Sequence, residues 1–515
     1  DNADQGTLTI LGTSAIGGNI GSSNALATIS AGVANTTTTF SGNVNAATIS
    51  LASGATSFGG TVSGVVNVKG GSVTLGASAS GDANSSINYT SGGTLTIAGK
   101  NRTIDFSDIS GPTTIVTSTA DESTLVFNTN VTASALTFGG TGTEITFNDM
   151  TNIGTMNFTA SDQILNFNGG GSSSVNFKTF NGTVNAGPST LNNTMTASPG
   201  NTAGSFVISG EGEFTQGGQI GTTATQRLAE VKINSGINAT FDYAVYAQNI
   251  DIDGPSSFTS LVTTDTIKVS DVSATFDNTV VGNISITKAG GVINTTNSGY
   301  YISGSVDNTT GDDNVGTLNL AGTTVTGVVG GSNPLLLVDV KGNSTFQSTV
   351  NAATTKVESG ITAYFSGDVN GSISLYSGTA SLGGVTVNGA IDGSADNTGN
   401  LTMTYGSTIN GAVGATHSLA SINLFNTYGG ASTFNGTVNT KALTLNSASY
   451  SSATFNDVLT VADAAKFTGS NQNLILAADA NFANGISFNG YNSTITLDST
   501  DGDHTFTGAI TTTAN

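Results

Sequence analysis

The stretch that decides the fold is residues 40–62, which read FSGNVNAATISLASGATSFGGTV. Phe40 is followed four residues later by Val44, and the same pair returns as Phe58 and Val62. Pairs that follow one another directly are 17 to 19 residues apart. The pairs in the chain are Phe40/Val44, Phe58/Val62, Phe241/Val245, Phe258/Val262, Phe276/Val280, Phe346/Val350, Phe365/Val369 and Phe434/Val438. A short period of this kind is typical of a repeat protein, in which one unit cannot bury its apolar face alone.

A second apolar pair, such as Ile49 and Leu51, follows most of the Phe–Val pairs. In an extended chain Phe40 and Val44 point to one face, and Ile49 and Leu51 have the opposite parity, which requires an extra residue or a bend. About 18 residues at ~3.3 Å each can wind once around a narrow core and stack at ~4.8 Å on the next turn. We therefore predict an all-β fold, a right-handed parallel β-helix (β-solenoid) with rungs of about 17–19 residues in which Phe stacks on Phe. A string of antiparallel sandwiches is the alternative, but it has no reason to keep this register.

The regularity of the repeat divides the chain into three predicted parts. Residues 1–100 read as regular solenoid rungs. Residues 101–230 keep strand-like segments such as 125–127 and 145–147 but lose the Phe spacing, so irregular or longer rungs are expected in the middle. Residues 231–515 return to regular rungs and contain a duplicated module.

The composition excludes several classes of protein. The 515 residues include 69 Gly, no Cys and no Trp, only 9% are charged, and the net charge is −21. The mixture of Thr, Ser, Asn, Ala and Gly argues against a helical protein. The lack of Cys excludes disulfides and thiolate metal sites, and the acidic charge argues against nucleic-acid binding. No apolar stretch is long enough for a membrane-spanning helix. The start at Asp1 without a signal-like region predicts a processed or excised segment.

A larger repeat lies over the short one. A motif of the form G-x-[IV]-G followed by a polar stretch and alternating aliphatic residues begins at Gly18, Gly218, Gly327 and Gly411. An Asp/Asn/Gly-rich motif precedes the last two by about 22 residues, as GSVDNTTGDDNVGTLNL from Gly304 and GAIDGSADNTGNLTM from Gly389. A module of 84 to 88 residues is thus duplicated.

These paired motifs resemble the passenger repeats of the rickettsial outer-membrane protein A family, with protein B as a looser relative. The residues that carry the resemblance are 307–311 with 313–316, and 18–29, and the likeness extends from residue 16 to about 425. It implies an autotransporter passenger of the cell-surface antigen type, a secreted β-solenoid displayed outside an outer membrane. The family's C-terminal translocator barrel has no counterpart in this sequence, so the anchor is expected to lie outside it. Kinship with surface-layer proteins of other bacteria stays open.

Residues capable of catalysis are few, and no catalytic or cofactor-binding residue is assigned. His504 lies near Ser499 and Asp503, but adjacent strand residues point to opposite faces, so Asp503 is poorly placed to orient it. His417 is expected in a loop at a rung corner. The close acidic pairs are Asp251/Asp253, Asp312/Asp313 and Asp501/Asp503, and without Trp a glycosidase cleft has little support. We predict that the protein is not an enzyme.

Calcium is the better-motivated ligand, although no metal-binding residue is assigned. The loops at 307–314, 392–397 and 498–503 supply hard oxygen donors, but Asp-Gly and Asn-Gly are also ordinary turn formers. Asparagines at similar places in the rung, such as Asn43, Asn45 and Asn67, are expected to stack into amide ladders.

Two functions fit these features. The first is an adhesin or surface-coat component, whose partner is a host or neighbouring-cell surface protein. The alternative is a structural subunit of a surface layer or extracellular filament, which associates with copies of itself in a calcium-dependent way. Both place the chain outside the cell, at a bacterial outer surface.

Overall fold

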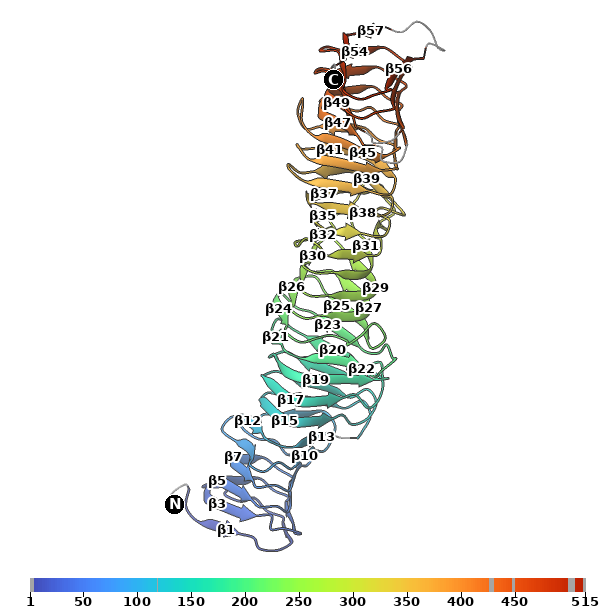
Figure 1. Ribbon diagram of the computed structural model, residues 1–515. Helices are drawn as coiled ribbons and strands as arrows, with labels where there is room; N and C mark the ends of the chain where they lie inside the picture. The colour runs from blue at the N-terminus through green and yellow to red at the C-terminus, as the bar shows by residue number, and fades with distance from the viewer. Residues whose placement is uncertain (1–3, 118, 426–429, 447–449, 499–504, 513–515) are drawn as a thin grey trace. The chain divides into compact units, whose positions relative to one another are not determined.

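The computed structural model describes residues 4–117, 119–425, 430–446, 450–498 and 505–512. These residues form 58 β-strands, and none of them lies in a helix. The ladders between strands are parallel and build about 25 turns of a β-solenoid, which confirms the predicted fold class. The chain divides into two compact units, Asp1–Thr263 and Thr264–Asn515. Within each unit, strands of successive turns lie side by side (Figure 1).

One turn of the first unit shows how the Phe–Val repeat folds. β4 (Thr37–Phe40) and β5 (Val44–Leu51) belong to one turn, and β6 (Ala55–Phe58) and β7 (Val62–Val68) to the next. Phe40 pairs with Phe58 and Val44 with Val62, and the two buried rings stack with centroids 5.3 Å apart. The prediction that each Phe and its Val share one extended segment was wrong. Phe40 ends one strand and Val44 begins another, because the glycine-containing segment between them turns the chain.

The change of parity inside the repeat occurs within β5. Val44 and Ala46 are buried, and the inward positions then move to Ile49 and Leu51. The ladder with β7 shifts register between Asn45 and Thr48, so two residues on β5 lie opposite one on β7. The extra residue that the sequence pattern requires is therefore a β-bulge.

The middle of the chain is ordered with a longer period. β14 (Thr124–Phe127), β16 (Glu144–Phe147) and β18 (Ile164–Phe167) pair in register. The rings of Phe127, Phe147 and Phe167 stack at centroid distances of 5.0 and 5.8 Å, and residues one turn apart are 20 positions apart there. The expected longer rungs are present, but the aromatic stack is not lost. The boundaries predicted at residues 100 and 230 stay a prediction.

Turn length varies in both units. It is 17 residues between Phe241 and Phe258 and 25 between Asn294 and Asn319. Strands of seven or eight residues have the most outward-facing positions. They include β27 (Val245–Ile252) in the first unit and β37 (Leu335–Gly342), β39 (Val350–Val357), β41 (Val369–Leu375) and β49 (Val438–Leu445) in the second. The length of each turn decides which outward side chains meet.

The first unit contains a buried cation that is bound by backbone carbonyls. Arg102, at the start of β11 (Arg102–Ile104), is 6% exposed. Its guanidinium donates to the backbone carbonyls of Gly76, Ala79 and Ala98, the first at 2.6 Å. Burial lowers the pKa of Arg102. The carbonyl oxygens therefore replace water around the charged guanidinium. No sequence motif predicts a buried cation at this position.

Candidate interaction surfaces

The four G-x-[IV]-G motifs occupy equivalent turns. Their central residues pair with the Val that follows in the next turn, as Ile20–Val44, Ile220–Val245, Val329–Val350 and Val413–Val438. The second glycine of each motif has a φ of 65° to 67°. A Cβ at this glycine would lie 2.2 to 2.5 Å from a carbonyl oxygen of the next turn. Only glycine fits such a position, so the motif is a structural requirement of the turn below a Phe–Val pair.

At three of the four motifs, an asparagine of the next turn donates a hydrogen bond to the carbonyl of the second glycine. The Nδ2 of Asn351 donates to the carbonyl of Gly330 at 2.8 Å. The same bond joins Asn45 to Gly21 and Asn439 to Gly414, each at 3.2 Å. Since each asparagine directly follows the paired Val, the glycine motif and the next Phe–Val pair form one folding unit.

Aspartates of the two Asp/Asn/Gly-rich motifs accept hydrogen bonds from a loop of the following turn. In the first copy of the module, the Asp307 carboxylate accepts from the backbone N–H and the hydroxyl of Ser332, at 2.8 and 2.7 Å. In the second copy, Asp392 accepts from the backbone N–H of Thr416 at 3.0 Å. In each copy of the module, a carboxylate on a short strand, β34 (Val306–Asn308) or β44 (Ile391–Gly393), therefore binds the backbone of the next turn.

Calcium stays a prediction. Among the residues that the structure describes, no group of three or more His, Asp or Glu side chains could hold a metal ion. Asp307 and Asp392 already bind amides of the next turn. Of the third predicted loop, Asp498 is described and residues 499–503 lie outside the described part of the chain.

The predicted histidine and acidic positions do not form a catalytic cluster in the described chain. His417 Nδ1 lies 3.4 Å from Asp396 Oδ1, with both side chains exposed. Asp251 and Asp253 alternate with the buried Ile250 and Ile252, as a strand surface requires. The exposed Asp312 and Asp313 lie in the first acidic loop, whereas His504, Ser499, Asp501 and Asp503 lie outside the described residues.

Amide ladders are present, but not at the residues first expected to form them. In the second unit each Nδ2 donates to the Oδ1 one turn earlier at 2.6 to 2.7 Å, along Asn351, Asn370, Asn388, Asn410, Asn435 and Asn456. A shorter ladder joins Asn128, Asn148 and Asn168. Asn43 instead accepts from the backbone of Thr61, and Asn45 binds Gly21. Asn67 lies beside a groove. A ladder needs an asparagine at the in-register position of the next turn, and Asn45 pairs there with Ser63, whereas Asn351 pairs with Asn370.

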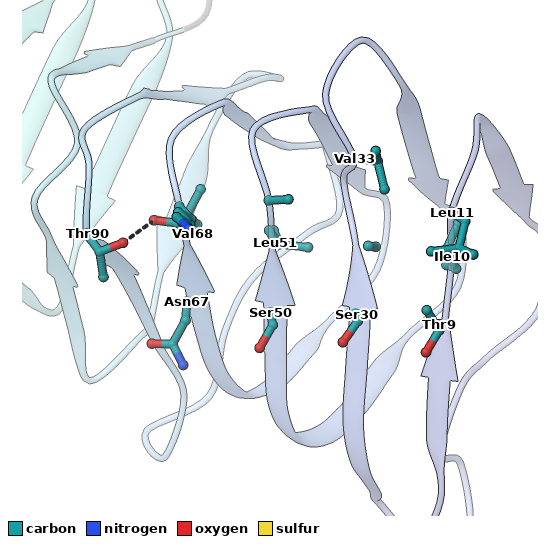
Figure 2. Close-up of a pocket in the computed structure, with 13 residues that line it drawn as sticks. Thr9, Ile10, Leu11, Ser30, Val33, Ser50, Leu51, Asn67, Val68 and Thr90 are labelled. Carbon is teal, nitrogen blue, oxygen red and sulfur yellow. Dashed lines mark hydrogen bonds between the residues drawn. The ribbon is translucent and has the colours of Figure 1, made fainter.

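An apolar groove of about 410 Å³ lies at the ends of β1 (Thr7–Thr9), β3 (Leu26–Ala31), β5 and β7. Its floor consists of residues buried in successive turns, Ile10, Ala31, Leu51 and Val68. Figure 2 shows Thr9, Ser30, Ser50 and Asn67 following one another along one side. Leu11 on the rim is 78% exposed. Exposed apolar surface of this kind is typical of a contact site.

A charged cluster marks the outer face of the second unit. Lys356 forms an ion pair with Glu358, and its Nζ lies 3.9 Å from Asp339 Oδ1 and 4.6 Å from the centre of the Tyr376 ring. Lys341 Nζ lies 3.5 Å from Asp339 Oδ2. The hydrogen bond to Glu358 raises the pKa of Lys356. The sequence analysis missed this cluster because its members come from three different turns.

Comparison with known proteins confirms the resemblance noted in the sequence. The chain is 32% identical to outer membrane protein A of Rickettsia rickettsii over 280 residues, which are 48% of this chain and 12% of that protein. It is 32% identical to outer membrane protein A of Rickettsia conorii (strain ATCC VR-613 / Malish 7) over 182 residues, or 34% of this chain and 9% of that protein. The chain thus spans about a tenth of the length of these curated relatives. No family model and no solved structure matches it.

The relatives and the fold together fit a surface-displayed, adhesin-like β-solenoid of the autotransporter-passenger type. Both are consistent with a protein that is not an enzyme. In the described part of the chain, no helix has the length and apolar character needed to cross a membrane.

Proposed function

We propose that this chain is part of an extracellular passenger that acts as an adhesin or surface-coat component at a bacterial outer surface and performs no catalysis. The observation that supports this most is the match between its solenoid repeats and outer membrane protein A of two Rickettsia species. The partner is a host or neighbouring-cell surface protein. The similarity covers a small part of those proteins, so attachment must be measured on this chain itself.

The physical properties of the solenoid support a role in display. Its core is a column of stacked apolar side chains, in which each turn contacts only its neighbours. Outward positions carry mainly Thr, Ser and Asn, and the charge of −21 keeps the chain soluble. Each unit of such a scaffold presents the outward side chains of many turns without needing disulfides or bound metal for its core.

The test is saturable binding of the labelled, purified chain to cultured animal cells. We expect binding that unlabelled chain competes away and that protease treatment of the cells abolishes. Leu11→Ser removes an exposed leucine at the groove, and Leu497→Ser removes one of similar exposure, 58%, in the second unit. A loss with the first variant alone locates the contact at the groove. Binding that neither saturates nor depends on cell-surface protein would contradict an adhesin.

One observation favours the alternative, a subunit of a surface layer or filament. Outward residues of β4, β6, β8 (Ser72–Leu75), β10 (Thr94–Ile97) and β13 (Thr114–Val116) pair in register. They form an uncharged row of Thr37, Ala55, Ser72, Thr94 and Thr114, a surface on which two acidic chains can approach with little repulsion. Electron microscopy with calcium and with a chelator tests this. Regular sheets or fibres would favour the layer, and dispersed single particles in both conditions would exclude it.

A further inference from the structure

The outer face of β37, β39 and β41 has the kinds of side chain that bind a small molecule. Leu337 pairs with Thr354, Asp339 with Lys356, and Lys356 with Ser374. Three consecutive turns therefore place an apolar group, hydroxyls and opposite charges side by side. Beside them lies a groove of about 290 Å³, lined by Leu336, Leu337, Thr354, Lys356, Ser374 and Tyr376.

The groove has apolar walls that nothing in the described chain covers. Leu336 is 53% exposed and Tyr376 is 43% exposed. They face a groove whose volume is at the lower end of the range for small-molecule sites, roughly 300–1,000 Å³. The space fits one ring-sized group, and it is far too small for a helix, whose diameter with side chains is about 10–12 Å.

The carboxylates of Asp339 and Glu358 hold the Lys356 ammonium at the edge of this groove. Asp339 is 7% exposed, and its Oδ1 has no hydrogen-bond partner. It lies between two lysines, and the Lys356 side chain is 26% exposed. An ammonium has three N–H donors, and the hydrogen bond to Glu358 uses one of them. Lys356 is thus a pre-oriented cation with donors left for a ligand, in a chain that is otherwise strongly acidic.

We propose that this groove binds a sugar residue that carries a carboxylate. The carboxylate binds the Lys356 ammonium, the ring hydroxyls bind the Thr354 and Ser374 hydroxyls, and the C–H face of the ring packs against Tyr376 and Leu336. Each lining group then has a counterpart in the ligand. Lys341, whose side chain is half exposed, adds positive potential to the same edge.

Other ligand classes match fewer of these groups. A neutral sugar brings no anionic group to the Lys356 donors that Glu358 does not use. A phosphate would bring two negative charges beside Asp339 and Glu358 and would leave the walls formed by Leu336 and Tyr376 uncovered. An acidic peptide side chain can reach the ammonium but has no hydroxyls for Thr354 and Ser374.

This inference rests on the proposed function, because it identifies the class of cell-surface ligand, but it can be tested apart from cell attachment. The probes are free N-acetylneuraminic acid and glucuronic acid, with N-acetylgalactosamine and a short polyglutamate peptide as comparators. Binding is followed by saturation-transfer NMR and calorimetry on the full chain. We expect both acidic sugars to bind, with saturation transferred from the protein to the sugar ring protons that face Tyr376. Both comparators should bind at least tenfold more weakly.

Two variants and two matched controls complete the test. Lys356→Gln should lower the affinity for acidic sugar by roughly tenfold or more, as expected for a lost hydrogen bond to a charged group. Tyr376→Ala should lower it as well while leaving the charges in place. The controls are Lys466→Gln and Tyr364→Ala, which change exposed residues of the same unit on other strands, β52 (Ala465–Phe467) and β40 (Thr362–Phe365). They should leave the affinity unchanged.

The outcomes separate the site from the function. Equal binding of neutral and acidic sugars, tighter binding of polyglutamate, or no effect of Tyr376→Ala in a folded variant would overturn the proposal. If Lys356→Gln abolishes sugar binding but cell attachment persists, the site stands and attachment uses another surface. If acidic sugars bind but the chain never attaches to cells, the site stands and the adhesin function fails.

Discussion

Phe434→Ala tests whether the solenoid is stabilised one turn at a time. Phe434 is fully buried at the end of β48 (Ala431–Phe434). Its ring lies 4.5 Å from that of Phe455 one turn later, with only 2° between the planes, and its backbone pairs with Ile409 one turn earlier. Truncation removes both side-chain interfaces and leaves a cavity that neighbouring backbone cannot fill.

The cost follows from burial and stacking. Burying a phenylalanine and avoiding the cavity is worth about 3–5 kcal/mol, of which the aromatic pair supplies about 0.5–1.5 kcal/mol. Since each turn contacts only its neighbours, this loss should lower the opening free energy of the adjacent turns alone. Amide exchange there should accelerate by roughly a hundredfold to several thousandfold.

Hydrogen exchange resolved by peptide measures this directly. The amide of Asn456, which donates to the Phe434 carbonyl, should lose protection, whereas the amide of Ser366, which donates to the Phe346 carbonyl, should keep it. Phe346→Ala is the matched control, because Phe346 stacks on Phe365 at 5.1 Å, and it should reverse the pattern. Equal loss at both amides in either variant would refute the one-dimensional picture and indicate a single cooperative unit.

Three further changes test individual contacts. Gly414→Ala places a Cβ at a φ of 66° and 2.2 Å from the Asn439 carbonyl oxygen; it should lower unfolding free energy in urea by about 1–3 kcal/mol from the backbone strain alone, and more than Asn439→Ala does. Arg102→Met leaves buried carbonyls without a donor and should cost about 1–3 kcal/mol in thermal unfolding. The hydrogen bond from Ser63 is the main cause that lowers the pKa of Asp82 below 3.8, so the stability it contributes is present above that pH and is lost as pH falls through the lowered pKa. Ser63→Ala should reduce that acid sensitivity in exchange measurements, and the hydrogen bonds from Asn84 and Ser85 should preserve the rest.

The core could be predicted from the sequence, because inward positions obey a simple parity rule. Phe40 and Phe58 stack as their spacing indicates, and the shift of parity before Ile49 correctly required an extra residue. The break between Phe40 and Val44 could not be seen, since a strand that ends and a strand that continues can bury the same residues. The aromatic stack of the middle region could not be seen in the same way, because its period is 20 residues and the Phe–Val repeat has 17 to 19.

The surface sites could not be predicted in the same way. Asp339, Lys356 and Tyr376 are separated by about one turn each, and the length of a turn differs along the chain from 17 to 26 residues. An error of one residue in a turn moves an outward side chain to the inward face, so a cluster that spans three turns requires every register to be known. The amide ladder that includes Asn351 has a simpler cause, because the in-register partner of Asn351 is Asn370, whereas that of the equivalent Asn45 is Ser63.

Surface and core are therefore under different constraints in this chain. A turn can gain or lose residues in its loops without disturbing the inward column, provided that the strands on either side keep their pairing. The same change moves the outward groups of the strands against one another and can create or remove a site such as the Lys356 groove. The two copies of the duplicated module both keep the contact of an aspartate, Asp307 or Asp392, with the next turn, whereas the pair Asp339–Lys356 of the first copy is Asn423–Thr444 in the second. Duplication of a multi-turn module therefore copies the contacts that join one turn to the next, while the outward groups of each copy can differ.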